Sequence, residues 1–138
     1  MTNVVIDASA GVELALRSNV GRALRSKLSP SSRFWVPEHY FAEVGAALRR
    51  LEMTNVYPSA RIQIALDRVL SQPNRRVSVR TLVAQAWTRR HNVTLADALY
   101  VVVAQHLDAP LVTADLKLAS APVGGHEILR VGGHETAR

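Results

Sequence analysis

Two aspartates follow apolar segments that are typical of buried β-strands. Asp7 comes directly after the β-branched run 4–6, and Asp115 lies just beyond the segment 111–113. In an open α/β sheet, ligands bind in the crevice outside the carboxyl ends of the strands. Two acids projecting into that crevice would repel each other unless a cation lay between them. Alternatively, each aspartate opens the next turn or caps the next helix, as Asp commonly does.

Asp97 is a stronger indication of chemistry. It falls in the first turn of the most apolar helix that the sequence predicts, residues 95–107. An ionised aspartate is almost never buried unless it is paired or binds a metal. The segment Thr94-Leu-Ala-Asp97 also resembles a capping box, although the acid of that motif is usually Glu or Gln, whose longer side chain closes the reciprocal bond. The pattern therefore favours a functional carboxylate.

Glu43 is the fourth acid of interest. In the predicted helix 38–52 it lies at the edge of the apolar stripe, about 100° from its centre, where it could face a crevice beside the sheet. An ordinary boundary glutamate that bridges His39, four residues earlier, explains the same pattern. Taken alone, Glu43 favours this second interpretation.

Together the four acids have a chemical logic on a basic chain. The 138 residues include 17 Lys and Arg against 11 Asp and Glu, a formal charge of +6, and 15 of the cations are arginine. Such a protein is drawn to polyanions, while Mg²⁺ and Mn²⁺ prefer carboxylate oxygens. These features suggest metal-dependent phosphodiester hydrolysis, with arginines holding the polyanion. The alternative is a non-catalytic RNA-binding or partner-binding module whose acidic cluster docks a basic peptide.

Composition excludes several other classes of protein. The absence of cysteine excludes disulfides, thiolate zinc sites and cysteine nucleophiles. Ser9 lacks the glycines of a nucleophile elbow, which argues against a Ser-His-Asp hydrolase. His39 has no second histidine to complete a His-Glu-x-x-His motif, which argues against a zinc site of that type. No apolar run approaches the roughly 20 residues of a membrane span, and the start has no basic signal-peptide region. We therefore expect a soluble protein of the cytoplasm.

The acids must be positioned by one domain in which strands alternate with helices. The expected strands are 4–6, 34–36, 77–79, 110–113 and 128–131. The expected helices are 10–17 (capped by Ser9), 20–28, 38–52, one beginning near 58, 81–91, 95–107 and a short turn at 115–119. This alternation is typical of an α/β fold with a parallel sheet covered on both faces. Residues 132–138 are expected to form a flexible tail.

Some aromatic and basic residues allow two interpretations. Trp35 and Trp87 are expected in the core, which is commoner for tryptophan than a role as a base-stacking platform. The basic pairs 49–50, 75–76 and 89–90 either face RNA or form solvated surfaces.

Four segments carry a resemblance to a known family. Residues 4–10 (VVIDASA) resemble an opening strand with a first acidic motif, and 37–50 (PEHYFAEVGAALRR) resemble a Pro, Glu and Ala-Leu helix. Residues 94–104 (TLADALYVVVA) are the most recognisable segment, and 111–119 (LVTADLKLA) resemble a closing Thr-x-Asp motif. In this order the segments resemble the PIN-domain ribonucleases, and most closely the VapC-type toxins of bacterial toxin–antitoxin modules.

The resemblance implies a fold, an activity and a set of site residues. It implies a PIN-like three-layer α/β sandwich around a central, mostly parallel sheet, with residues 1–131 as a single nuclease domain. It implies an endoribonuclease toxin that depends on Mg²⁺ or Mn²⁺ and hydrolyses RNA, forms a homodimer, and is neutralised by a cognate VapB-like antitoxin. The residues that it assigns to metal binding, directly or through water, are Asp7, Glu43, Asp97 and Asp115, and those that it assigns to hydroxyl support are Thr113 and Ser9.

Overall fold

The computed structural model describes residues 2–120 and 128–130, which form a five-stranded parallel sheet. The strand order is β3-β2-β1-β4-β5, and all four neighbouring pairs are parallel. The strands are β1 (Thr2–Ile6), β2 (Ser32–Pro37), β3 (Arg75–Val77), β4 (Leu111–Thr113) and β5 (Ile128–Arg130). The chain runs outward from β1 to β3 and then returns to the other side of β1, so the order reverses between β1 and β4. The expected tail at 132–138 lies outside the described residues.

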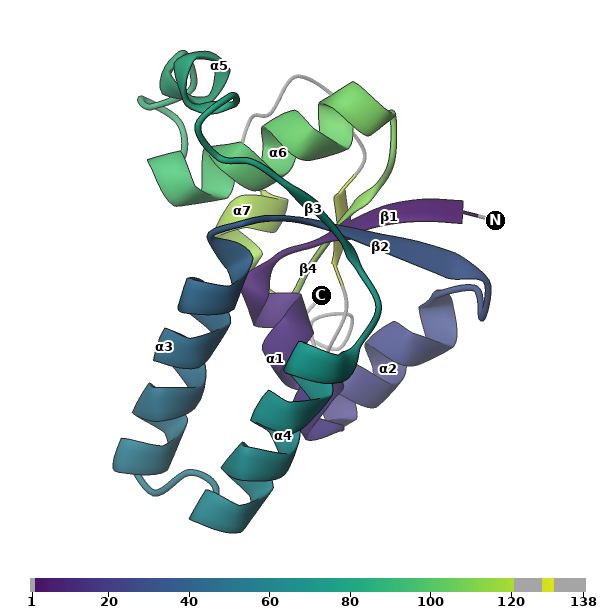
Figure 1. The fold of residues 1–138 in the computed structure, drawn as a ribbon, viewed down its shortest axis with the longest axis vertical. Helices are drawn as coiled ribbons and strands as arrows, with labels where there is room; N and C mark the ends of the chain where they lie inside the picture. Colours follow the sequence, from purple (N-terminus) through teal and green to yellow (C-terminus); the bar gives the residue numbers. More distant parts are fainter. Residues whose placement is uncertain (1, 121–127, 131–138) are drawn as a thin grey trace.

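Helices cover both faces of the sheet, which confirms the predicted three-layer α/β sandwich (Figure 1). One layer consists of α1 (Ala8–Leu16), α2 (Asn19–Lys27), α3 (Tyr40–Met53) and α4 (Ser59–Ser71). The other contains α5 (Val83–Trp87) and α6 (Leu95–Leu107), and the short α7 (Leu116–Ala119) follows β4. In the part of the chain that the structure describes, every helix is too short or too polar to cross a membrane.

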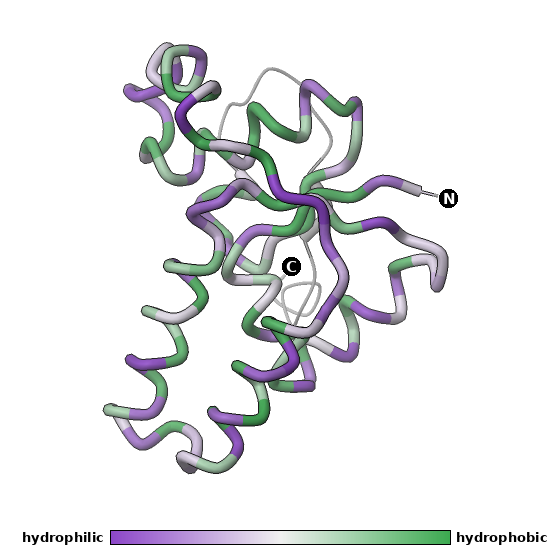
Figure 2. Tube along the Cα trace, viewed as in Figure 1, coloured by the Kyte–Doolittle hydropathy of each residue, from purple (hydrophilic) through white to green (hydrophobic). Residues whose placement is uncertain are grey.

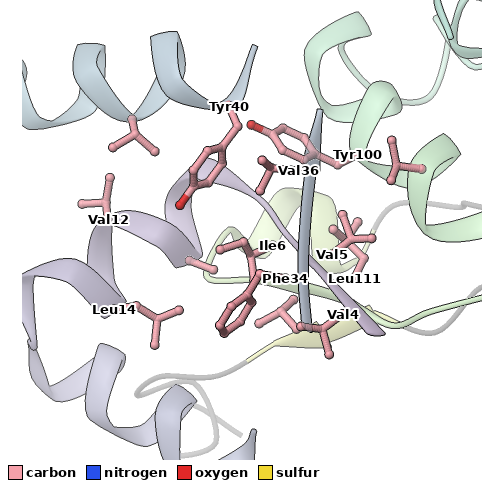
Figure 3. Close-up of a cluster of buried hydrophobic side chains, with 14 of the residues drawn as sticks. Val4, Val5, Ile6, Val12, Leu14, Phe34, Val36, Tyr40, Tyr100 and Leu111 are labelled. Atoms are coloured by element: carbon pink, nitrogen blue, oxygen red, sulfur yellow. The ribbon is translucent and has the colours of Figure 1, made fainter. Parts of the chain in front are cut away.

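The centre of the core is β1 packed against α6. Val4, Val5 and Ile6 are at most 2% exposed and lie within the apolar cluster of Figure 3. In α6, every residue from Ala98 to Ala104 is buried, as its almost continuous apolar sequence predicts. Burial of each large side chain contributes about 1.5–3 kcal/mol. The backbones that carry Asp7 and Asp97 are therefore attached to the buried centre of the molecule.

The region between α4 and α6 differs from its prediction. The expected strand at 77–79 is instead β3, Arg75–Val77, because residues 78–82 form a turn in which the Leu82 N–H donates to the Val79 carbonyl (2.9 Å). The expected helix at 81–91 shortens to Val83–Trp87. Beyond it, the Thr88 hydroxyl donates to the Gln85 carbonyl (2.7 Å), a local bond that competes with helix continuation.

The two tryptophans have different environments. Trp35 is partly buried, packs against the core and donates from Nε1 to Asn3 Oδ1 (3.1 Å). Trp87 is 54% exposed, so its expected place in the core is wrong. In this segment the buried positions are taken by Leu82, which precedes the short α5, and by Ala86 within it.

Helices α1 and α3 cross closely at Gly11, where an added Cβ would overlap the Tyr40 hydroxyl. Tyr40 is 3% exposed and has little room to move. We expect Gly11→Ala to lower the free energy of unfolding by about 1–3 kcal/mol through overpacking. Gly45→Ala is the matched control, because a Cβ there meets nothing within 4 Å and alanine favours the helix by about 0.5–1 kcal/mol. Urea unfolding of both variants tests this, and equal stabilities would contradict the close crossing.

Candidate active site

Asp7 is a buried carboxylate at the junction of β1 and α1, only 3% exposed. Its Oδ1 accepts hydrogen bonds from the Ala10 N–H (2.9 Å) and the Ser9 hydroxyl (2.7 Å), and its Oδ2 accepts one from the Thr113 hydroxyl. Asp7, rather than Ser9, is therefore the residue that caps α1. Ser9 instead lies one residue inside the helix, where its hydroxyl orients the capping carboxylate.

A chain of hydroxyl contacts connects Asp7 with Asp115. Thr113 is fully buried, and its Oγ1 lies 3.2 Å from Ser9 Oγ. Thr113 Oγ1 also accepts from the Asp115 N–H (2.9 Å), and Ser9 Oγ accepts from the Ala114 N–H (3.0 Å). Asp115 in turn caps α7 by accepting from the Lys117 N–H (2.9 Å). Asp7 and Asp115 thus cap α1 and α7, and the hydroxyls of Ser9 and Thr113 fix the two aspartates relative to each other.

The junction of β1 with β4 explains why these two acids meet. The strands are direct neighbours, and the Asp7 N–H donates to the Val112 carbonyl (3.1 Å). This is the point at which the strand order reverses, and crevices at such points are the usual ligand sites of open α/β sheets.

Glu43 and Asp97 approach the same crevice from α3 and α6. Glu43 Oε1 accepts from the Tyr100 hydroxyl (2.6 Å) and lies 3.6 Å from His39 Nε2, so the bridge to His39 is present as well. The Thr94 hydroxyl accepts from the Asp97 N–H (3.1 Å), which is half of the capping box. Tyr100 was not singled out from the sequence, although its spacing of three residues from Asp97 puts both on one face of α6.

All four acids line one cavity of about 330 Å³. Arg50 and Tyr100 also line it, together with Ser9 and small alanines, whereas Thr113 lies buried behind it. Among the described residues, no three His, Asp or Glu side chains are close enough to enclose a metal ion by themselves. Mg²⁺ commonly binds through one or two carboxylates and keeps several waters, so the carboxylates fit an open, hydrated site better than a closed one.

Comparison with known proteins decides the family. Residues 4–123 match the model of the PIN domain. The chain belongs to the PIN-domain family. Ribonuclease VapC3 of Mycobacterium tuberculosis is 37% identical over 126 residues, covering 91% of both chains. Ribonuclease VapC1 of the same species is 37% identical over 123 residues, covering 88% of this chain and 92% of its own. This PIN domain is therefore of the VapC type, as its motifs indicate.

Solved structures confirm the fold of this PIN domain. The chain is similar to Mycobacterium tuberculosis VapC20, described as a Sarcin-Ricin loop cleaving toxin, with a TM-score of 0.66 and 20% identity over 92% of this chain and 98% of the other. It is also similar to a chain of VapBC2 from Rickettsia felis, with a TM-score of 0.64 and 15% identity over 95% of this chain and 100% of the other.

The carboxylates of this PIN domain have no lysine or arginine as a salt-bridge partner among residues 2–120, and His39 beside Glu43 is cationic only when protonated. Burial raises the pKa of Asp7 to about 6, despite the hydrogen bonds from Thr113, Ala10 and Ser9 that lower it. The pKa of Asp97 is also raised, first by burial and then by the charges of Asp115 and Glu43. The site therefore contains more negative charge than its surroundings neutralise, a condition that favours a bound cation.

The raised pKa of Asp7 makes a prediction about stability without metal. Because the native state keeps this proton up to about pH 6 and the unfolded chain loses it near the ordinary value of 3.8, ionised Asp7 destabilises the fold above that window. We expect Asp7→Asn to gain stability relative to wild type as pH rises from 4 to 6, by about 3 kcal/mol in total, and to keep that gain at higher pH. Urea unfolding in EDTA from pH 4 to 8 measures the difference.

The exposed Asp67, on the surface of α4, provides the control for this pH series. Asp67→Asn removes the same charge without removing a buried carboxylate, so its stability should parallel wild type across the range. If the Asp7→Asn curve also runs parallel to wild type, the native carboxylate of Asp7 is not destabilised by burial.

Proposed function

We propose that this VapC-type PIN domain is an endoribonuclease toxin that hydrolyses RNA with the help of Mg²⁺ or Mn²⁺. The observation that carries the proposal is the gathering of Asp7, Glu43, Asp97 and Asp115 on one cavity without a lysine or arginine salt bridge among the described residues. A set of carboxylates alone would repel a phosphodiester. With a divalent cation it becomes a site that attracts one.

The proposed metal ligands are the carboxylates of Asp7, Glu43, Asp97 and Asp115, each of which binds the ion directly or through water. Their oxygens are the donors that hard cations prefer. When bound, the ion offsets the carboxylate charge, polarises a phosphate oxygen and lowers the pKa of a water that can attack phosphorus.

The other residues of the cavity hold these carboxylates in place. Hydrogen bonds from Ser9, Ala10 and Thr113 fix both oxygens of Asp7, and the Tyr100 hydroxyl fixes Glu43. Such fixed dipoles need not reorganise during the reaction, which is the main source of electrostatic catalysis. Ser9, Thr113 and Tyr100 are therefore proposed as positioning residues.

Partners follow from the relatives rather than from the cavity. Because the curated relatives are named VapC ribonucleases and the similar structure from Rickettsia felis contains a VapBC pair, we propose a VapB-type antitoxin for this chain. A homodimer is also proposed, because the resemblance to VapC-type toxins implies one, and action in the cytoplasm is proposed because RNA substrates are found there.

Cleavage of RNA is the direct test. We expect purified wild-type protein to cut total cellular RNA in Mg²⁺ or Mn²⁺ but not in EDTA. Asp97→Asn should slow cleavage by about 100-fold or more, the usual cost of losing an electrostatic group at a reacting centre. Asp67→Asn should cut at the wild-type rate. Mapping the new 5′ ends would also identify the preferred sequence.

The opposite result would favour the non-catalytic alternative. If neither metal supports cleavage and Asp97→Asn leaves toxicity in cells unchanged, the acidic cavity is a docking site for a basic peptide.

Metal binding gives a second test that needs no RNA. A ligand that binds only the folded state raises its stability, by about 2.7 kcal/mol at 100 times its dissociation constant. We expect Mg²⁺ or Mn²⁺ to raise the melting temperature of wild type and of Asp67→Asn equally, and to raise that of Asp7→Asn much less. A full response in Asp7→Asn would remove Asp7 from the ligand set.

A further inference from the structure

Trp87 occupies an unusual position for its residue type. Tryptophan is highly buried on average, yet Trp87, at the end of α5, is 54% exposed. Its ring is also held in a defined pose. The guanidinium carbon of Arg90 lies 4.8 Å from the ring centroid, and Arg90 Nη1 donates to the Trp87 carbonyl (3.0 Å). Arg90 lies against the indole, and about half of the Trp87 side chain remains exposed.

The chain around Trp87 is entirely without acidic residues. From residue 68 to 96 there are six arginines and one histidine but no Asp or Glu. Figure 2 shows hydrophilic segments on both sides of α5. Arg80 and Arg90 are exposed. Three arginines therefore lie within seven residues of Trp87 in the sequence, at positions 80, 89 and 90, and no acid does.

A second cavity lies next to the acidic site. It has a volume of about 140 Å³, and its lining includes Asn92, Thr94, Asp97 and Lys117. Asp97 belongs to both cavities, while Asn92 is two residues from Arg90. In addition, Arg89 Nη2 donates to Gln105 Oε1 (2.6 Å), which fastens this segment to α6 about 12 Å along the helix axis from Asp97. A few nucleotides would span that length.

We propose that Trp87 and Arg90 form a stacking platform for an unpaired base of RNA, outside the acidic cavity. Aromatic and guanidinium faces stack on bases of any sequence, and the cations around them attract the phosphates. The inference rests on the proposed function, because it describes how the same RNA is held beside the carboxylates.

Charge argues for RNA over a second copy of the chain. In a twofold symmetric dimer the same patch meets itself, so a contact centred on Trp87 would bring two acid-free, arginine-rich segments together. Such a contact is disfavoured by repulsion between like charges. A polyanion meets no such penalty.

The test compares Trp87→Ala and Trp87→Phe with Leu70→Ala, a control at another exposed apolar residue (64% exposed, on α4). Binding of a fluorescent 12-nucleotide single-stranded RNA and of a duplex RNA of the same length is measured by anisotropy in EDTA, where no metal-dependent cleavage occurs. Loss of one stacked base should weaken single-strand binding by about 5- to 100-fold in Trp87→Ala. Trp87→Phe, which keeps an aromatic face, should retain most of the affinity, and duplex binding should change little.

A second readout reports on the ring itself. In a Trp35→Phe background, Trp87 is the remaining tryptophan, and single-stranded RNA should quench its fluorescence. Melting temperatures of all variants establish that they are folded.

Three outcomes would overturn the platform: no RNA binding by wild type, unchanged single-strand affinity in Trp87→Ala, or an equal loss for duplex and single strand. If Trp87→Ala instead changes the oligomeric state and leaves RNA affinity intact, the patch is a contact between copies and the proposal is wrong. The cleavage assay described above tests the nuclease function independently of the platform. Loss of single-strand binding in Trp87→Ala supports the platform even if wild type fails to cut RNA.

Discussion

The burial of one carboxylate organises the functional end of this protein. Asp7 is held by hydrogen bonds rather than by a countercharge, with donors from both α1 and β4. The same three bonds begin the first helix, close the junction between β1 and β4, and set the position of Asp115 through Thr113. Because hydrogen bonds only partly offset the cost of burial, the carboxylate keeps a raised pKa. The ionised Asp7 carboxylate therefore destabilises the fold at the site where catalysis is proposed.

The fold was predictable where local patterns and tertiary packing agree. The β-branched run before Asp7 and the continuous apolar stretch from Ala98 to Ala104 require burial wherever they occur, and together they form the centre of the core. Between α4 and α6 the pattern was weaker. There, side-chain hydrogen bonds such as that of Thr88 shortened the helix, and Trp87 emerged at the surface because shorter residues filled the buried positions.

The candidate site was predictable as a set of residue types but not as an arrangement. Asp7 and Asp115 could be placed at strand ends, since parallel strands bring their carboxyl ends to one edge. The cap that Asp7 makes on α1 is a local bond and was one of the two roles that the sequence allowed, whereas its hydrogen bond from Thr113, more than a hundred residues away, could not be predicted. That Tyr100 and Arg50 line the cavity could not be predicted, because it depends on how α3 and α6 are placed relative to each other.

The hydrogen bond from Tyr100 on α6 to Glu43 on α3 joins the two helical layers, which lie on opposite faces of the sheet (Figure 1). A second contact, between His39 Nε2 and the Ala96 carbonyl (3.0 Å), joins them beside it. The wall of the acidic cavity thus contains direct contacts between two helical layers that the sheet otherwise separates. A ligand in the cavity would therefore lie between side chains of both helical layers, so its binding would add a further link between them.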